Sequence, residues 1–132
     1  MTKQYQTRQT IQKIKIMEFL KNSKSHPNAE TIYKHIKNEL PTITLATIYR
    51  NLNQLANNGK ILRFKVGNEF RFDGDISTHQ HCICKKCGCI TDTFHKNINK
   101  YALKHMNSDR FTPTEVNIIF SGYCKKCGGN KK

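Results

Sequence analysis

Two pairs of cysteines, each with two residues between its members, are the strongest chemical signal in this 132-residue sequence. The pairs are Cys84 with Cys87 and Cys124 with Cys127. The short gap lets both sulfurs of a pair reach one ion, and four thiolates complete the tetrahedral shell of zinc. The spacing therefore predicts a structural zinc site. The alternative is two independent redox pairs, which would make the chain a thiol–disulfide redox protein.

A second set of donors lies beside the first cysteine pair. His79 and His81 are spaced H-x-H, and Asp92 follows the pair. Imidazole nitrogens and a carboxylate are harder ligands than thiolates, so they suit a separate ion such as ferrous iron, manganese or zinc. Taken singly, each residue could be an ordinary strand or surface residue. Cys82 and Cys89 are either small core residues or free thiols, with thiol-based redox sensing a minor hypothesis.

The charge balance favours a polyanionic partner. Lys and Arg number 23 against 9 Asp and Glu, which gives a formal net charge of +14. A strongly basic chain favours nucleic acid, although basic charge alone can also serve solubility. No stretch approaches a membrane span, and the metal-type spacing of the cysteines suits a reducing compartment, so we expect a cytoplasmic protein without a membrane partner. No general base or oxyanion site accompanies the His/Asp set, so we expect no enzyme.

Three helices are predicted in the first part of the chain. With their capping residues they are expected over residues 8–22, 28–40 and 44–58. Ile11, Ile14 and Phe19, with Met17 and Leu20 as further candidates, fall at helical spacing and are expected on the buried face of the first helix. Asn28 and Thr44 provide N-caps for the second and third.

A β-hairpin is predicted next. Leu62–Val66 and Glu69–Asp73 alternate in polarity, and Gly67-Asn68 supplies the turn. Three helices and a two-stranded ribbon in this order predict a winged helix-turn-helix, whose third helix enters the major groove while the wing lies along the DNA backbone. The alternative for that helix is a solvated amphipathic segment. The candidate DNA contacts are Thr47, Tyr49, Arg50, Asn53 and Gln54 on the helix, and Arg63 and Lys65 on the wing.

The rest of the chain predicts a second α/β unit. Strands are expected near residues 81–84, 89–94 and 115–123, with a helix over 96–106. The predicted fold class is therefore α+β, an N-terminal winged helix followed by a small α/β domain with a four-cysteine zinc site. The expected domains are residues 1–74 and 79–132, joined by a hinge at 75–78.

Five stretches carry a family resemblance. They are His26-Pro-Asn-Ala-Glu-Thr-Ile-Tyr33, Leu45-Ala-Thr-Ile-Tyr-Arg-Asn-Leu52, Arg71-Phe-Asp73, His79-Gln-His-Cys-Ile-Cys-Lys-Lys-Cys-Gly88 and Gly122-Tyr-Cys-Lys-Lys-Cys127. Over nearly its whole length the chain resembles the ferric uptake regulator family of metal-dependent repressors, and its peroxide-sensing branch above all.

The resemblance implies a regulatory ion, Fe²⁺ or Mn²⁺, held by three histidines and two aspartates. The matching positions are His26, Asp73, His79, His81 and Asp92. It also implies that peroxide acts at the iron-loaded site and oxidises a ligand histidine, corresponding to His26 or His79, which releases ion and DNA. Iron-uptake members usually have Glu where Asp92 stands, so that residue carries the branch assignment.

One ion held by all five residues would couple the two domains, so that metal occupancy biases their orientation. A symmetric homodimer on a pseudo-palindromic double-stranded operator is the expected assembly, with the second domain as the dimer interface by resemblance. The predicted function is a metal-dependent DNA-binding repressor that senses hydrogen peroxide through iron-catalysed histidine oxidation. The alternatives are an iron- or zinc-uptake regulator of the same family, a thiol–disulfide redox protein and a metal-storage module.

The sequence departs from the family pattern in three places. Only about nine residues precede the stretch Thr10–Lys13, so most of the family's long first helix is expected to be missing. Arg50 is commoner in the iron regulators. Gln80, Asn99 and Val116 stand where the ligands of an additional metal site would match, so no such site is expected.

Overall fold

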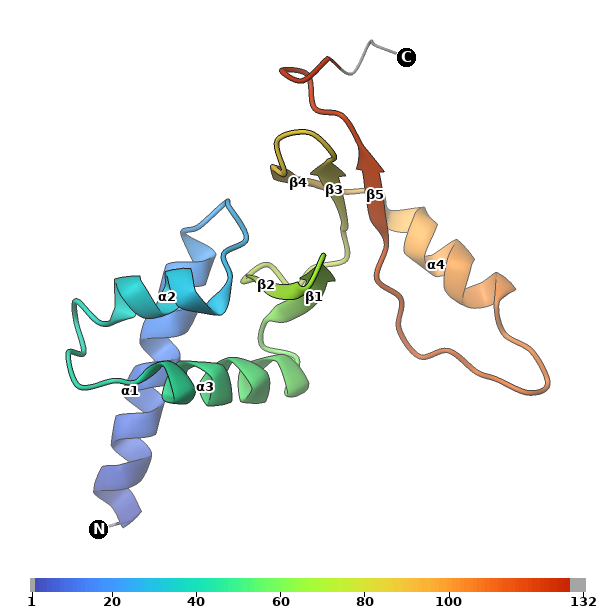
Figure 1. Cartoon of the computed structure of the whole chain (residues 1–132). Coiled ribbons are helices and arrows are strands. Elements are labelled where there is room, and N and C mark those ends of the chain that lie inside the picture. Colours follow the sequence, from blue (N-terminus) through green and yellow to red (C-terminus); the bar gives the residue numbers. More distant parts are fainter. Residues whose placement is uncertain (1, 129–132) are drawn as a thin grey trace. The chain divides into compact units, whose positions relative to one another are not determined.

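The computed structural model describes residues 2–128, which divide into two compact units with a boundary between Ile76 and Ser77. The first unit contains α1 (Thr2–Lys21), α2 (Ala29–Ile36), α3 (Leu45–Asn57), β1 (Leu62–Val66) and β2 (Glu69–Asp73). The second contains β3 (Gln80–Cys84), β4 (Ile90–Thr93), α4 (Lys96–His105) and β5 (Ile119–Gly122). Figure 1 shows these elements along the chain. The α+β class predicted from the sequence is confirmed.

Apolar side chains from the three helices and β2 form one core in the first unit. Its most deeply buried members are Ile16, Ile32, Ile36, Ile48, Leu52 and Phe72. The predicted caps are present: Asn28 Oδ1 accepts from the Thr31 N–H at 2.9 Å, and Thr44 Oγ1 accepts from the Thr47 N–H at 3.1 Å. Each cap satisfies a backbone donor that the first turn of a helix leaves open, which fixes where α2 and α3 begin.

The first helix differs from the prediction in length and in its buried face. It begins at Thr2 because the polar residues before Arg8 contain no glycine or proline and the helix continues through them. Ile16 and Leu20, one turn apart, are buried, whereas Ile11 and Ile14 are 43% and 48% exposed. Leu20 is thus buried as expected, and Met17 and Phe19 pack against the core, but Ile16 occupies the buried position that the spacing assigned to Ile11 and Ile14.

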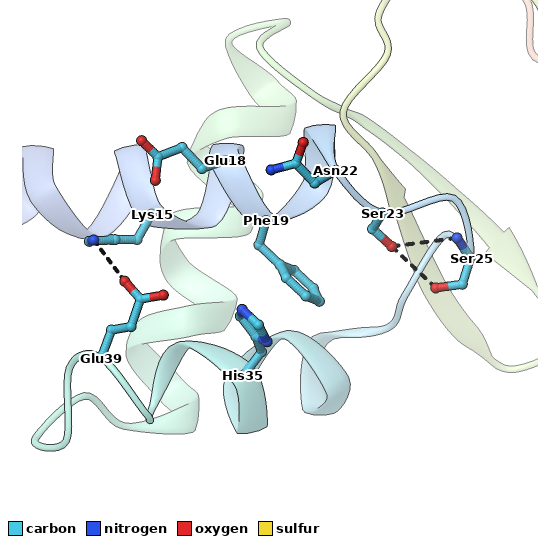
Figure 2. A pocket seen from close by; sticks show the side chains of 8 residues that line it. All are labelled: Lys15, Glu18, Phe19, Asn22, Ser23, Ser25, His35 and Glu39. Atoms are coloured by element: carbon cyan, nitrogen blue, oxygen red, sulfur yellow. Dashed lines mark hydrogen bonds and ion pairs between the residues drawn. The ribbon is translucent and has the colours of Figure 1, made fainter.

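The second helix ends at Ile36, earlier than predicted. Turns follow it, and the Leu40 N–H still bonds to the Ile36 carbonyl at 2.9 Å. Figure 2 shows how this end meets α1: Lys15 Nζ lies 2.7 Å from Glu39 Oε1, and the Phe19 ring stacks on His35 with centroids 4.2 Å apart. The ion pair is exposed and adds little stability, so ring stacking and the core hold α1 against α2.

The β1–β2 hairpin has the predicted strands and turn. Phe64 pairs with Arg71 and Lys65 with Phe70, and Gly67 adopts a φ of +64°, which the tight turn requires. Gly74 follows the hairpin where the end of α1 comes close. A Cβ at Gly74 would lie 3.0 Å from backbone atoms of Leu20 and Lys21, so only glycine fits without a shift.

The second unit is a three-stranded sheet with the order β4-β3-β5, and α4 follows β4 (Figure 1). β3 pairs antiparallel with β4 and parallel with β5. The last strand is shorter than predicted, because it begins at Ile119 and not near Glu115. Val116 lies in the segment before this strand. Its carbonyl accepts a hydrogen bond from the Asn99 side chain at 3.3 Å and not from a neighbouring strand.

The second unit has a small apolar core. Among its described residues, 77–128, Cys84 and Ile90 are the buried apolar side chains, and α4 buries none. Large apolar side chains are instead exposed: Phe94, Tyr101, Met106, Phe111, Phe120 and Tyr123. Burial this limited does not offset the entropy of ordering the chain, so the unit needs a further source of stability. None of the helices within residues 2–128 is long and apolar enough to cross a bilayer.

Candidate functional site

Parallel pairing of β3 with β5 brings the two C-x-x-C segments together. Cys84, the last residue of β3, pairs with Gly122, the last residue of β5, and Cys124 follows two residues later. The carboxyl ends of parallel strands meet at the same edge of a sheet. The cysteines that leave those ends therefore converge, although 37 positions separate Cys87 from Cys124.

The two cysteine segments form turns of the same design. Each reads Cys-Lys-Lys-Cys-Gly, and the closing glycines, Gly88 and Gly128, have φ values of +78° and +84°. That backbone conformation suits glycine and turns the chain back, so both cysteines of a turn face the same side. The sulfur ligand atoms of Cys84, Cys87, Cys124 and Cys127 all lie within 4.8 Å of one another.

The four thiols also have the chemistry that zinc requires. Backbone N–H groups, first that of Cys87 and then that of Cys124, lower the pKa of the Cys84 thiol to about 5. The Cys127 N–H likewise lowers the pKa of Cys124, while the side-chain bond to Cys124 raises the pKa of Cys127 to about 12. Crowded thiolates repel one another without a cation, and a divalent ion removes that repulsion. Four convergent sulfurs with thiolate-stabilising N–H donors fit a structural zinc ion.

Cys82 and Cys89 are the two cysteines outside this four-sulfur set. Cys82 lies within β3 and is half-buried, whereas Cys89 is exposed at the end of the first turn. Side-chain hydrogen bonds, first with Cys87 and then with Cys124, raise the pKa of the Cys89 thiol. The sequence left Cys82 and Cys89 open between small packing residues and free thiols.

The second unit places His79, His81 and Asp92 together. His81 and Asp92 are direct partners across β3 and β4, so their side chains share one face of the sheet. The Nε2 atoms of His81 and His79 lie 3.5 and 3.6 Å from Asp92 Oδ1. The two imidazole rings are 4.7 Å apart, and Phe94 stacks on His79. One carboxylate thus faces two imidazole nitrogens.

A backbone contact sets the tautomer of His79. Its Nδ1 lies 2.6 Å from the Ser77 carbonyl oxygen. A carbonyl oxygen only accepts, so Nδ1 carries the hydrogen and Nε2 of the neutral ring keeps its lone pair for a metal. This is the outer hydrogen bond that metal-binding histidines usually make.

The first unit contributes the remaining pair of predicted ligands. His26 Nε2 lies 3.3 Å from Asp73 Oδ2, and both residues are buried. The two oxygens of Asp73 are used differently, since Oδ1 accepts from the Asp75 N–H at 2.9 Å. That bond orients the carboxylate so that Oδ2 faces the imidazole. Sequence reasoning assigned these two residues through resemblance alone, and the hairpin brings them into contact.

His26 has an unusual backbone conformation. Its φ of +54° lies in the left-handed region, which costs a non-glycine residue about 1–3 kcal/mol. Neighbouring contacts hold it there: Arg71 Nη1 donates to the His26 carbonyl at 3.0 Å, and the Phe72 N–H donates to the Pro27 carbonyl at 3.0 Å. Arg71 is itself oriented by Glu69 at 2.9 Å. The hairpin thus fixes the turn that aims the imidazole at Asp73.

Replacing His26 by asparagine should separate metal binding from stability. Asparagine adopts the left-handed region readily, so His26→Asn should remain folded. His26→Val should be less stable than His26→Asn by about 1–2 kcal/mol. Both variants should lose Mn²⁺ affinity equally, since neither keeps the imidazole. Urea unfolding and Mn²⁺ titration measure the two effects. An asparagine variant that binds Mn²⁺ like the parent would remove His26 from the ligand set.

The third helix presents the candidate DNA-contacting residues in two ways. Tyr49, Arg50, Asn53 and Gln54 are exposed on it. Thr47 is half-buried, and its hydroxyl accepts from Arg50 Nη2 at 3.4 Å. The opposite face joins the core through Ile48, Leu52 and Leu55. The outward row of α3 is therefore polar and exposed, apart from the half-buried Thr47.

The wing residues contact an aromatic ring and the third helix. Arg63 and Lys65 lie over the exposed Phe70 ring, 5.4 and 5.9 Å from its centroid. Arg63 Nη1 also donates to Asn53 Oδ1 at 2.8 Å. The wing cations are thus held on the same side as the outward row of α3, which suits a strip of phosphates.

Residues 4–121 match the sequence profile described as the ferric uptake regulator family. The chain belongs to the ferric uptake regulator family. It is 34% identical over 119 residues to the peroxide-responsive repressor PerR of Staphylococcus epidermidis. That alignment covers 89% of this chain and 79% of the relative. It is 31% identical over the same length to the peroxide operon regulator of Bacillus subtilis, covering 89% of this chain and 82% of the relative.

The structural comparison agrees with the sequence comparison. The Campylobacter jejuni peroxide stress regulator superimposes with a TM-score of 0.81 at 30% identity, covering 96% of each chain. The resemblance inferred from the five sequence stretches is therefore confirmed. The similarity extends over both units of the chain, the winged helix and the sheet of the second unit.

The sequence did not predict two polar contacts, one between helices and one at the His26 turn. Asn51 is buried in α3, and its Nδ2 donates to Gln12 Oε1 of α1 at 3.1 Å. Arg71 lies in one of the family-matching stretches, and its guanidinium donates to the His26 carbonyl. A polar residue at a position where helical periodicity demands an apolar one was the available signal for Asn51. No local signal indicated the partner of Arg71.

Proposed function

We propose that this chain is a metal-dependent transcriptional repressor that releases DNA when peroxide oxidises one of its metal ligands. Its membership of the ferric uptake regulator family and its likeness to peroxide-responsive repressors support this function. The single structural observation that supports it best is the presence of two hard-ligand pairs, His26 with Asp73 and His81 with Asp92, in addition to a separate four-sulfur set. No catalytic turnover is assigned to the chain.

The proposed regulatory ion is Fe²⁺ or Mn²⁺, bound by His26, Asp73, His79, His81 and Asp92. Three neutral imidazoles and two carboxylates balance a divalent cation, and five donors leave one position open in an octahedral ion. The donors come from both units, so binding one ion would favour one orientation of the units over others. Differential affinity of that kind is what couples metal occupancy to DNA binding.

The proposed peroxide response uses the ligand histidines. Bound ferrous iron supplies one-electron chemistry with peroxide, which manganese supports poorly. Oxidation adds one oxygen atom to an imidazole, and we assign it to His26 or His79 by resemblance. An oxidised ring is a weaker ligand, so the site loses affinity for its ion and the protein loses the orientation that binds DNA.

The proposed DNA-binding unit is the winged helix, residues 1–74, with α3 in the major groove and the wing on the backbone. The proposed dimer forms through residues 79–132, and residues 75–78 act as the hinge. The exposed aromatic and apolar side chains of the second unit, such as Phe111 and Tyr123, support this assignment, since large apolar groups in solvent favour an interface. A dimer of this kind matches a pseudo-palindromic operator, and we propose that it acts in the cytoplasm.

Two substitutions test the DNA-binding proposal. An operator is first selected from random duplexes with the Mn²⁺-loaded protein. Arg50→Ala should then weaken binding to that operator by about 1–3 kcal/mol and relax the preference at one base pair. Lys65→Ala should lower affinity for all duplexes and flatten the salt dependence, because a phosphate contact carries no sequence information. Fluorescence anisotropy at several salt concentrations gives both quantities.

The control is the exposed Lys60, which precedes the wing. Lys60→Ala should leave operator discrimination unchanged. If the parent protein selects no sequence, or binds equally well after Mn²⁺ is removed, the repressor proposal is wrong. If Arg50→Ala discriminates like the parent, α3 does not read bases through that side chain.

A further inference from the structure

A buried glutamine lies between two of the proposed metal ligands. Gln80 separates His79 from His81 at the start of β3, and its side chain is fully buried. Its Nε2 donates to the His95 carbonyl at 2.9 Å and to Asn99 Oδ1 at 2.6 Å, while its Oε1 accepts from the His95 N–H at 3.1 Å. An amide with this many partners has one orientation.

Asn99 extends the network to a third segment. Its Oδ1 accepts from Gln80 while its Nδ2 donates to the Val116 carbonyl at 3.3 Å. The hydrogen bonds therefore join β3 to the beginning of α4 and to the stretch before β5. His95, the residue before α4, makes no capping hydrogen bond with its own side chain, so Gln80 provides the contacts at that helix end.

The position of Gln80 determines what the network does to the ligands. Successive side chains of a strand point to opposite faces, so the residues on either side of Gln80 share the face opposite to it. β3 is five residues long and pairs with β4 over four positions. Fixing the Gln80 amide on one face fixes the rotation of this short strand, and with it the direction of both imidazoles.

We infer that Gln80 and Asn99 are positioning residues of the regulatory metal site. They keep His79 and His81 aimed at Asp92, and they make the metal affinity depend on the position of α4. This inference rests on the proposed function, which assigns the histidines to the regulatory ion. Amides suit the role because each is donor and acceptor at once, so the network closes without an ion and without charge.

Paired substitutions at Asn99 test the inference in the full-length, zinc-loaded protein. Asn99→Ala removes the acceptor of Gln80, whereas Asn99→Asp keeps an oxygen there. Asn97→Ala, at an exposed position of the same helix, is the matched control. Asn99→Ala should lower Mn²⁺ affinity about 10-fold, the lower end of the effect of losing a direct hydrogen bond to a metal ligand, because Asn99 acts on the histidines only through β3. Asn99→Asp keeps the oxygen that accepts from Gln80 but loses the donor to the Val116 carbonyl, so it should weaken Mn²⁺ binding less than Asn99→Ala does, and Asn97→Ala should equal the parent.

A metal-free readout separates this inference from the proposed function. In the NMR spectrum of the zinc-loaded protein without Mn²⁺, the imidazole signals of His79 and His81 should shift in Asn99→Ala, whereas that of His105 should not. Unchanged imidazole signals, or equal damage from Asn99→Asp and Asn99→Ala, would overturn the positioning role. Loss of zinc in Asn99→Ala would also overturn it, since the network would then support the fold alone. If the parent protein binds no Mn²⁺ through these histidines, the proposed function is wrong, whatever the result for Asn99.

Discussion

Cys84→Ser is expected to release the zinc ion and to unfold the second unit. The four sulfurs lie within 4.8 Å of one another, and this unit buries few apolar side chains among its described residues. Structural zinc contributes an apparent binding free energy of about 10–16 kcal/mol, which is comparable to the whole stability of a typical domain, about 5–15 kcal/mol. A hydroxyl in place of one thiolate removes a zinc ligand. The small apolar core of this unit cannot compensate for the stability that is lost with the ion. The proposed dimer should be lost with the fold.

Zinc content, hydrogen exchange and size-exclusion chromatography measure the three consequences. Cys82→Ser is the matched control, because Cys82 lies in the same strand but outside the four-sulfur set. It should retain zinc and the fold. A zinc-free Cys84→Ser protein that remains a folded dimer would refute the structural role. If Cys84→Ser keeps its fold but abolishes a reductase activity toward insulin disulfides, the thiol–disulfide alternative gains support.

Local patterns allowed most elements to be predicted, because caps, turns and alternation act over a few residues. Asn28 and Thr44 begin their helices as expected, and the Gly67-Asn68 turn joins the predicted strands. The meeting of Cys87 with Cys124 depends instead on β3 pairing in parallel with β5, which no local pattern encodes. The cysteine spacing predicted the site from the chemistry of zinc and not from the path of the chain.

The conformation of His26 could not be predicted for a related reason. A residue before proline is biased toward an extended backbone, yet His26 has a positive φ. Contacts with the hairpin, through Arg71 and Phe72, override that local preference. The face of α1 was likewise decided by packing against α2 and α3, which buries Ile16 and leaves Ile11 exposed. Sequence reasoning therefore found the donors but not the contacts that aim them.

Brief peroxide treatment of the iron-loaded protein is expected to oxidise a peptide containing His26 or His79 and to abolish operator binding. The imidazole gains one oxygen atom, and the rest of the peroxide leaves as water. The manganese-loaded protein, given the same dose, should show neither change, because manganese fills the N/O site but supports this one-electron chemistry poorly. Mass spectrometry of the digested protein and anisotropy with the operator give the two readouts.

Asp92→Glu tests the same response through ligand geometry. Asp92 lies on β4 directly opposite His81 of β3. Its Oδ1 atom is 3.5 Å from His81 Nε2 and 3.6 Å from His79 Nε2. Glutamate keeps the charge and a donor oxygen, so metal-dependent DNA binding should survive. Its extra methylene moves the carboxylate relative to both imidazoles, so histidine oxidation should fall by about 10-fold or more. Asp109→Glu, an exposed change in the same unit, is the control and should oxidise like the parent.

Two metals and two proteins give four outcomes, which distinguish a peroxide sensor from a metal-uptake regulator. A sensor predicts strong oxidation only in the parent with iron, because only that combination has both the reactive metal and the Asp92 geometry. Equal oxidation in all four samples would mean that peroxide attacks exposed side chains without help from the site. If the iron-loaded parent shows no oxidation but still binds DNA in a metal-dependent way, the His/Asp set would sense metal concentration, as in a metal-uptake regulator. Under the proposed function, the length of the side chain opposite His81 is expected to decide whether the same donors respond to peroxide or to metal alone.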